Sequence, residues 1–492
     1  MTWSRYRAEW FGNVRSDLLA GLLISLALIP EAIAFSIVAD VDPKVGLYAS
    51  FAIAVVIAFA GGRPGMISAS TAAVALLVTN LVDDHGLQYL LAASVLAGVF
   101  QIVAGFLRIG KLMRFISTPV MTGFVNALAI LVFLAQVPEL HGVNWQTYPM
   151  VAAGLLIIFI LPRFFTAIPS PIISVLVLTV VSVAMGLNVH EVQDKGALPE
   201  SLPSFGWPDI PFTFETFKIL APYSLSMMFA GLLESLMTAR LLDEITDTPS
   251  NKNHEAAGQG IANIVSGLVG GMAGCAVVGE SLLNHKFGGR GRLSTFCAGG
   301  FLIVLVVALG DWVGRIPMPA LVAVLIAISI GAFDWNSLRA IRIQPVTATA
   351  VMIVTVIGTV VTKNLAIGVA VGVVFNGLFF AWEIAHSVHV ASEIEGERQR
   401  VYTVNGPIFF ASAERFIHAF DFHEPLSHVK IDVRHAHFWD TSAIAALDRV
   451  VMKLRSGGAT VEVSGTNPRS ASMIDRLAIH DKPEATGQLA SH

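Results

Sequence analysis

Charged residues are scarce in this sequence. Only 13% of its 492 residues are Asp, Glu, Lys or Arg, whereas a typical soluble domain carries about 25%. Hydrophobic residues make up 54%, and the mean hydropathy is +0.70. This composition excludes an ordinary soluble enzyme and a disordered chain. The net charge of -4 lacks the basic excess that attracts nucleic acid.

Cysteine is almost absent as well. Cys275 and Cys297 lie in apolar or glycine-rich stretches, which excludes a disulfide framework. No Gly-Lys-Ser/Thr follows the glycine-rich run at residues 61–65, so this run is not a phosphate-binding loop. Nothing groups His, Cys and carboxylates at metal-ligand spacing. The sequence therefore predicts no enzyme activity, no cofactor and no metal centre.

Long apolar segments fill the first part of the chain, and about 20 such residues suffice to cross a bilayer. Lys and Arg gather in alternate loops, for example at Arg63, Arg240 and Arg339. This pattern places the amino terminus and the tail on the cytoplasmic side of a cell membrane. We predict fourteen segments, the first over residues 18–39 and the others centred near residues 52, 74, 98, 127, 156, 178, 228, 262, 280, 302, 325, 352 and 375.

The tail differs in composition from the rest. Charged residues are about twice as dense after residue 390 as before it, and about 100 residues is an ordinary domain size. The sequence thus predicts a transmembrane domain over residues 1–390 and a soluble domain over residues 391–492.

Two of the predicted segments, about 68–80 and about 275–286, are too short to cross a bilayer alone. Each follows a glycine-rich run, at residues 61–65 and 270–274. Each is also third in a run of seven segments, and an odd number of spans per repeat inverts the second copy. The first segment of each half carries one acid, Glu31 or Glu234. The sequence therefore predicts an α-helical polytopic membrane protein built as a 7+7 inverted repeat.

The two short segments predict where a ligand binds. A half-helix that begins in mid-membrane directs free N–H groups and a partial positive charge at the midplane. Two such ends facing each other bind an anion without any cationic side chain. The candidate binding residues are Ser68, Ser70 and Thr71 at one end, and Cys275, Ala276, Val277, Val278 and Gly279 at the other.

Three carboxylates are candidates for holding a coupling ion: Glu234, Glu31 and Glu280. A charged side chain at the bilayer centre costs about 2.5–3.5 kcal/mol on insertion scales. A retained acid therefore faces a cavity, binds a cation or takes up a proton, and the coupling ion is predicted to be H+ or Na+. The alternative is an interhelical hydrogen bond with no role in transport.

The motif at residues 28–36, Leu-Ile-Pro-Glu-Ala-Ile-Ala-Phe-Ser, and the run at 270–294 resemble the SulP family of sulfate permeases. The resemblance spans nearly the whole chain. It implies a core domain of segments 1–4 and 8–11 that moves against a gate domain of segments 5–7 and 12–14. The substrate would lie between the third and tenth segments. Family members carry sulfate, bicarbonate, chloride, oxalate or dicarboxylates, by symport or exchange.

The tail resembles a STAS domain, an α/β fold. The run at 438–447, Phe-Trp-Asp-Thr-Ser-Ala-Ile-Ala-Ala-Leu, looks like its strand-to-helix loop. In the related anti-sigma antagonists the second residue after the Asp is phosphorylated, and Ser442 stands there. Capping of the next helix by Asp440, Thr441 or Ser442 explains the same residue types. Because relatives dimerise with STAS involvement, the resemblance also implies a homodimer.

One position departs from the animal relatives, which carry Arg in the tenth segment where this chain has Glu280. An acid there favours a cotransported cation over passive exchange. The sequence thus predicts a secondary active transporter that couples H+ to uptake of a dicarboxylate or a sulfate-like oxyanion by alternating access.

Three alternatives remain open. The tenth-segment run also looks like the sodium-coupled bicarbonate branch, which suggests a Na+-dependent bicarbonate symporter. A proton–nucleobase symporter shares the membrane architecture, although those relatives lack a STAS tail. An anion channel or a membrane sensor with a STAS output is the third.

Overall fold

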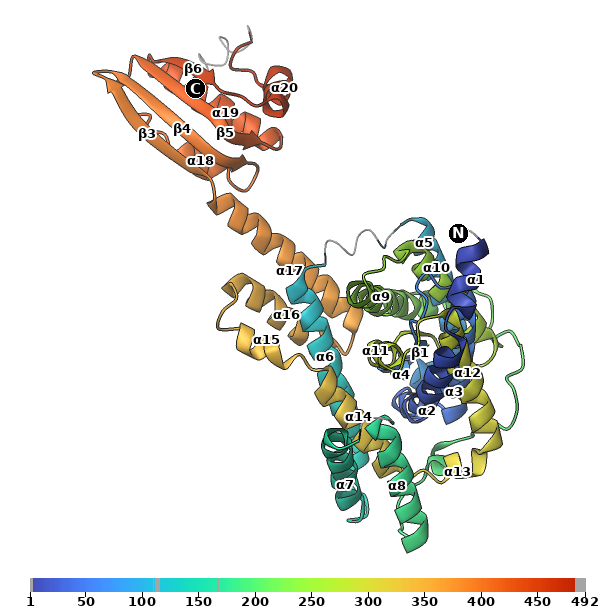
Figure 1. The fold of residues 1–492 in the computed structure, drawn as a ribbon. Helices are drawn as coiled ribbons and strands as arrows, with labels where there is room; N and C mark the ends of the chain where they lie inside the picture. Colours follow the sequence, from blue (N-terminus) through green and yellow to red (C-terminus); the bar gives the residue numbers. More distant parts are fainter. Residues whose placement is uncertain (1–2, 109, 111–115, 166–167, 483–492) are drawn as a thin grey trace. The chain divides into compact units, whose positions relative to one another are not determined.

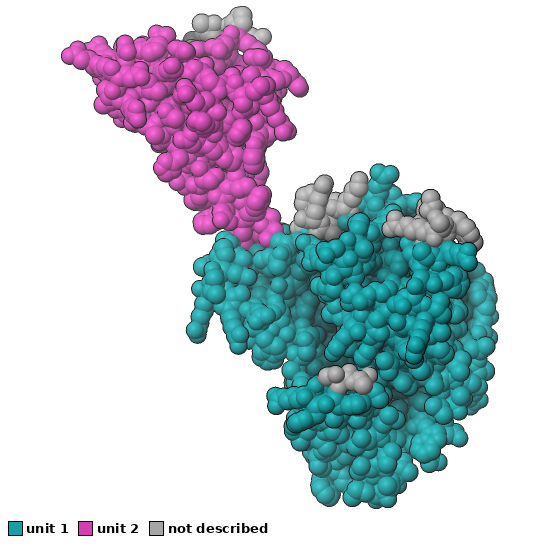
Figure 2. Space-filling model, viewed as in Figure 1, with its two compact units in different colours: residues 1–373 teal, residues 374–492 magenta. Residues whose placement is uncertain are grey.

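The computed structural model describes residues 3–108, 110, 116–165 and 168–482. It divides into two compact units, residues 1–373 and residues 374–492 (Figure 2). The division falls within helix α17, Leu365–His386.

The first unit is helical, and every predicted segment falls on a helix of the described residues. Seven described helices are long and apolar enough to cross a bilayer unaided. Short helices α1 (Trp3–Phe11), α13 (Gly310–Gly314) and α15 (Trp335–Ala340) lie between or before the segments. The segments are α2 (Val14–Val38), α3 (Pro43–Ala60), α4 (Ala72–His85), α5 (Leu87–Phe106), α6 (Thr118–Gln136), α7 (Thr147–Ile160), α8 (Ser170–Met185), α9 (Phe214–Thr246), α10 (Lys252–Leu268), α11 (Val278–Lys286), α12 (Arg292–Ala308), α14 (Met318–Ala332), α16 (Val346–Thr362) and α17.

These helices pack in two groups (Figure 1). In the core group, α2–α5 and α9–α12, α10 packs against α5 and α3, and α12 packs against α2 and α3. In the gate group, α6–α8, α14 and α16, α14 packs against α6 and α7, and α16 packs against α6. Glycines allow close packing inside the core group, because any side chain at Gly98 would overlap the backbone of Gly260. The two groups meet where α2 contacts α14 and α8, and where α4 contacts α6.

Both short segments begin as extended chain before they become helical. Strand β1, Ser68–Ser70, precedes α4, and strand β2, Gly274–Ala276, precedes α11. The strands pair antiparallel, with Ala69 opposite Cys275. This antiparallel pairing is the arrangement that an inverted repeat requires, and it brings the amino ends of α4 and α11 together.

Buried polar side chains support β2, because a three-residue strand leaves backbone groups without a ladder partner. Asn263 from α10 accepts from Gly274 N at 2.9 Å and donates to Gly274 O at 3.1 Å. Ser94 from α5 accepts from Ala273 N at 2.8 Å. Side chains of the core group thus fix where α11 starts.

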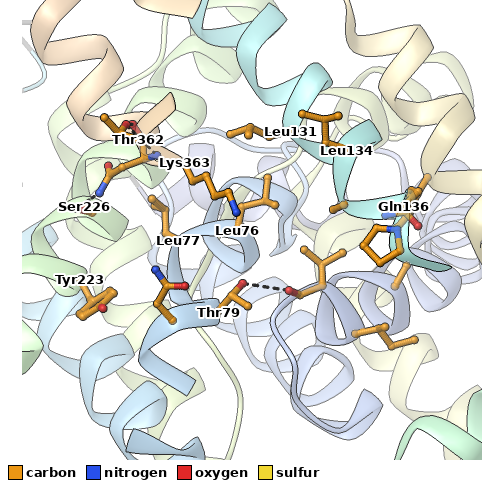
Figure 3. Close-up of a pocket in the computed structure, with 18 of the residues that line it drawn as sticks. Leu76, Leu77, Thr79, Leu131, Leu134, Gln136, Tyr223, Ser226, Thr362 and Lys363 are labelled. Carbon is orange, nitrogen blue, oxygen red and sulfur yellow. Dashed lines mark hydrogen bonds between the residues drawn. The ribbon is translucent and has the colours of Figure 1, made fainter. Parts of the chain in front are cut away.

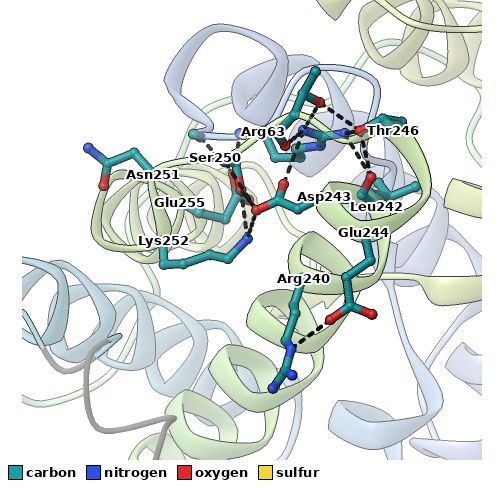
Figure 4. Close-up of polar contacts among 12 residues, drawn as sticks. Arg63, Arg240, Leu242, Asp243, Glu244, Thr246, Ser250, Asn251, Lys252 and Glu255 are labelled. Carbon is teal, nitrogen blue, oxygen red and sulfur yellow. Dashed lines mark hydrogen bonds and ion pairs between the residues drawn. The ribbon is translucent and has the colours of Figure 1, made fainter.

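A second polar network ties the turn before β1 to α9 and α10 (Figure 4). Arg63 lies 3.0 Å from Asp243, and Asp243 also binds Lys252 at 2.5 Å. Glu255 accepts from the backbone N–H groups of Gly62 at 2.6 Å and Arg63 at 3.0 Å. Burial lowers the pKa of Arg63, while the Asp243 and Glu255 carboxylates act in the opposite direction. The network anchors the chain that leads into the first half-helix.

The second unit contains a four-stranded sheet in the order β3 (His389–Gly396), β4 (Gln399–Ile408), β5 (His428–Phe438) and β6 (Thr460–Ser464). β3 pairs antiparallel with β4, and the other neighbours are parallel. Helices α18 (Ala413–His418), α19 (Thr441–Ser456) and α20 (Pro468–Leu477) complete it. Residues 483–492 of the predicted soluble domain lie outside the described residues.

Asp440 is the cap of α19, which confirms the structural interpretation of this loop. Its side chain accepts from Ala443 N and from Phe410 N, both at 2.9 Å. Ser442 lies half-buried in the first turn of the helix.

Candidate functional site

A cavity of about 740 Å³ lies between the core and gate groups, where α4 and α11 begin. We call it the coupling cavity. Its walls come from α2, α4, α6, α9, α11 and α14. Most of the predicted site residues line it: Glu31, Thr71, Glu234, Val277, Val278, Gly279 and Glu280.

Two carboxyl groups meet in this cavity. Glu31, on α2, and Glu280, in the first turn of α11, lie within hydrogen-bonding reach of each other. Both are buried, with 8% and 5% of their surfaces exposed. Two negative charges about 4 Å apart repel by about 4 kcal/mol at an effective dielectric constant of 20. The pair is therefore suited to take up a proton or another cation.

Glu234 has a different partner. The Cys275 thiol donates to Glu234 Oε2 at 2.9 Å, and the same sulfur lies 3.1 Å from Thr71 Oγ1. Thr71 is the N-cap residue of α4, and its side chain makes no capping hydrogen bond. A chain of contacts thus links the carboxyl of α9 to the start of the first half-helix through a residue of β2.

The remaining candidates, Ser68, Ser70, Cys275 and Ala276, lie behind the cavity in the β1–β2 pair. Ser70 Oγ is 2.8 Å from Ser50 Oγ, and Ala276 N donates to Ser235 Oγ at 3.0 Å. Ser68 Oγ is buried and has no hydrogen-bond partner within the described ranges. The extended strands turn these groups into the protein, and among the predicted hydroxyls Thr71 reaches the cavity.

A cationic side chain that was not among the predicted site residues also lines the cavity. Arg240 lines it, and its Nε donates to Glu244 Oε1, also in the lining, at 2.9 Å. The pattern of basic loops predicts a loop at Arg240, but α9 spans 33 residues and continues to Thr246. The i,i+4 spacing of Arg240 and Glu244, typical of a helical ion pair, was the available signal.

The carboxylates do not form a ready-made metal site. Within the described part of the chain, no three His, Cys, Asp or Glu side chains are grouped so that they could hold a metal ion. The prediction of no cofactor is untested by this observation.

A second cavity, of about 890 Å³, also lies between the core and gate groups (Figure 3). We call it the vestibule. Its walls include Thr79 from α4, Leu131 from α6 and Tyr223 from α9. Two lysines, Lys218 and Lys363, are part of its lining.

Comparison with known proteins agrees with this architecture. The profile of the sulfate permease family matches residues 14–152 and 140–357, and the STAS domain profile matches residues 390–491. The protein named "Putative sulfate transporter YbaR" of Bacillus subtilis (strain 168) is 52% identical over 472 residues, covering 96% of this chain and 98% of that protein. The bicarbonate transporter BicA of Picosynechococcus sp. is 28% identical over 400 residues, covering 73% of this chain and 69% of BicA.

Solved structures show the same fold. Murine Slc26a9, an anion transporter in its inward-facing state, superposes with a TM-score of 0.82 at 16% identity, covering 100% of this chain and 93% of that chain. The transmembrane domain of a cyanobacterial BicA gives a TM-score of 0.63 at 22% identity, covering 74% and 98%. These findings confirm the predicted family, the helical fold and the STAS domain. The chain therefore belongs to the sulfate permease family, as a multi-pass membrane transporter of small anions and not an enzyme.

Proposed function

We propose that this protein is a secondary active symporter that couples H+ to the uptake of a sulfate-like oxyanion or a dicarboxylate by alternating access. The observation that carries the proposal is the meeting of Glu31 and Glu280 in the coupling cavity, with Glu234 beside them. Arg240, which lines the cavity, is paired with Glu244.

The charge balance of this cavity supports the coupling. With its carboxylates ionised, the cavity repels an anion. This repulsion opposes the attraction of the anion by the partial positive charges at the starts of α4 and α11. Uptake of a proton removes a negative charge and leaves the amides of Val278 and Gly279 and the Thr71 hydroxyl for the anion. Proton and anion then bind better together than either does alone.

A transport assay in liposomes tests the proposal. Uptake of labelled sulfate and labelled succinate by the reconstituted protein is measured with an inward proton gradient and without Na+. We expect uptake to fall when a protonophore abolishes the gradient at constant membrane potential. An unchanged rate would reject proton coupling.

The sulfate-like substrate is supported by the likeness to YbaR, and Na+-dependent bicarbonate symport is the second candidate because of the likeness to BicA. External Na+ discriminates between them. Bicarbonate uptake that requires Na+ at constant pH would favour the second candidate and exclude H+ as the coupling ion.

We further propose that the amino terminus and the STAS domain face the cytoplasm and that the protein is a homodimer. The alternation of basic loops supports this orientation. Protease protection in intact cells tests the orientation, and the mass of the detergent-solubilised particle tests the dimer.

A further inference from the structure

The vestibule and the coupling cavity lie back to back on five shared helices, α2, α4, α6, α9 and α14. Residues of the two linings alternate along α2, where Glu31 and Phe35 face the coupling cavity and Ala34 and Val38 face the vestibule. The same alternation occurs on α4, α6 and α14: Ala72, Leu128 and Ile328 line the coupling cavity, and Leu76, Leu131 and Leu325 line the vestibule. On these four helices the two linings are therefore separated by about one helical turn, about 5.4 Å, and on α9 by more, because its lining residues stop at Ser226 and resume at Glu234.

The vestibule carries a positive charge excess. Lys218 and Lys363 line it, and neither forms an ion pair with a carboxylate among the described residues. The lining also includes Glu139, but Lys195 neutralises this carboxylate at 2.8 Å. His85, another lining residue, stacks on Tyr89. An anion that enters thus meets two lysines without a competing free carboxylate in the lining.

Lys363 occupies a position that ordinarily favours glycine. It ends α16 in the left-handed conformation, with φ of +50°, which L side chains rarely adopt and which usually carries Gly or Asn. Its side chain extends toward Leu76 in the vestibule (Figure 3). Asp247 ends α9 in the same conformation, so what distinguishes Lys363 is that its side chain lines the vestibule.

The next residue fixes this turn in place. Asn364 Oδ1 accepts from Ala366 N at 3.0 Å and from Ile367 N at 3.2 Å, which caps the start of α17. Its Nδ2 lies 3.4 Å from Ser226 Oγ on α9. Lys363 is therefore presented at the point where a gate-group turn contacts the core group.

We propose that the vestibule is an anion-capture site, in which Lys363 and Lys218 concentrate an oxyanion or a carboxylate before it crosses to the coupling cavity. The proposal rests on the alternating access proposed above, because it assigns the vestibule to the opposite mouth of the same path. Oriented positive charge in a cleft raises the local anion concentration and is screened by salt.

The local potential can be measured without transport. Asn80, an exposed residue of the lining, is changed to Asn80→Cys in the full-length protein, whose own cysteines are buried. The rates of labelling by an anionic and a cationic methanethiosulfonate reagent are compared. We expect the anionic-to-cationic ratio to fall by about threefold to tenfold in Lys363→Gly, and further with Lys218→Gln, from Coulomb interactions over this range. The difference should shrink at high ionic strength.

Matched variants separate charge from structure. Gly suits the left-handed position, so Lys363→Gly should fold, and Lys363→Asn provides a second neutral variant. Lys363→Arg should keep the parent ratio, and so should Lys44→Gln, whose lysine pairs with Asp42 and does not line the vestibule. An unchanged ratio in the Lys363→Gly, Lys218→Gln double variant, or an equal fall in Lys44→Gln, would overturn the proposal.

Transport provides the second arm. With labelled sulfate presented on the vestibule side, the apparent KM should rise in Lys363→Gly by a similar factor, with the maximal rate kept. The KM from the opposite side should stay unchanged, and equal shifts from both sides would also overturn the proposal. If wild-type protein moves no sulfate while the labelling ratio behaves as expected, the capture site stands and the proposed substrate fails.

Discussion

Glu234 differs from the other two carboxyls of the coupling cavity because its partner is a thiol. Gln in its place keeps the side-chain volume and can still accept from Cys275, but it cannot take up a proton. We expect Glu234→Gln to fold and to lose about tenfold or more of its uptake, with little pH dependence in what remains. Proteoliposome uptake across a range of external pH measures this, and Glu244→Gln, which lines the same cavity, is the control. A wild-type pH profile in Glu234→Gln would exclude this carboxyl from coupling.

The Cys275 thiol should act as a positioning group for Glu234. It lies between Glu234 Oε2 and Thr71 Oγ1, at 2.9 and 3.1 Å. Removing one buried hydrogen bond of this kind costs about 1 kcal/mol. We expect Cys275→Ala to move the pH at which uptake is half-maximal, whereas Cys275→Ser retains a donor and the parent profile. Equal shifts in both variants would point to packing and not to the hydrogen bond.

In the soluble unit, Asp448 carries a pH-dependent contribution to stability. Burial opposes its ionisation, but hydrogen bonds from the His480 side chain and from backbone N–H groups of Ile479 and His480 prevail, so its folded pKa lies below the ordinary value. Stability from this group is full above the unfolded pKa of about 3.9 and is lost as pH falls through the folded pKa.

Asp448→Asn should therefore destabilise this unit near neutral pH by about 1–2 kcal/mol. The difference in free energy of unfolding between Asp448→Asn and wild type should disappear as the pH falls below about 4. Urea unfolding of residues 389–492, which contain their own hydrophobic core, measures both. A gap that stays constant with pH would contradict this electrostatic origin.

At the scale of elements, the β1–β2 pair controls where the half-helices begin. A Cβ at Gly274 would overlap the backbone oxygen of Ala69 on the partner strand, whereas a Cβ at Gly279 would meet nothing within 4 Å. Gly274→Ala should therefore separate the strands and lower the melting temperature of the purified protein by several degrees, and Gly279→Ala should not. If Gly274→Ala melted at the same temperature as wild type, the β1–β2 pair would tolerate separation of its strands.

The half-helices could be predicted because their signal is local. Glycine-rich turns, short apolar stretches and a repeated acid mark them along the chain. The pairing of β1 with β2 could not be predicted, since strands of three residues show no periodicity and their partners lie about 200 residues apart in sequence. The length of α9 was missed for a related reason: Arg240 and Glu244 appear polar in sequence, although they continue a helix that ends after Thr246, where the distant Arg63 donates to Leu242 O and Thr248 O.

At the scale of the whole membrane unit, the proposed alternating access would make the two cavities and the barrier between them one path interrupted once. The coupling cavity contains the carboxyls and the starts of both half-helices, and the vestibule contains Lys218 and Lys363. If the core group moved past the gate group by about one helical turn, the starts of α4 and α11 would open to the vestibule and no longer to the coupling cavity. In the proposed cycle, the contacts that separate the cavities would therefore break and form again in each round of transport.

The contact between Ser226 and Asn364 tests this movement, because it joins the core group to a turn of the gate side at 3.4 Å. A Ser226→Cys, Asn364→Cys double variant, linked by a short bis-thiosulfonate reagent, should stop uptake, and a reductant should restore it. Each single variant treated with the same reagent should keep transporting, since neither ties the two groups together. Uptake at the unlinked rate after complete cross-linking would mean that the core and gate groups stay together at this end and that the path opens by another movement.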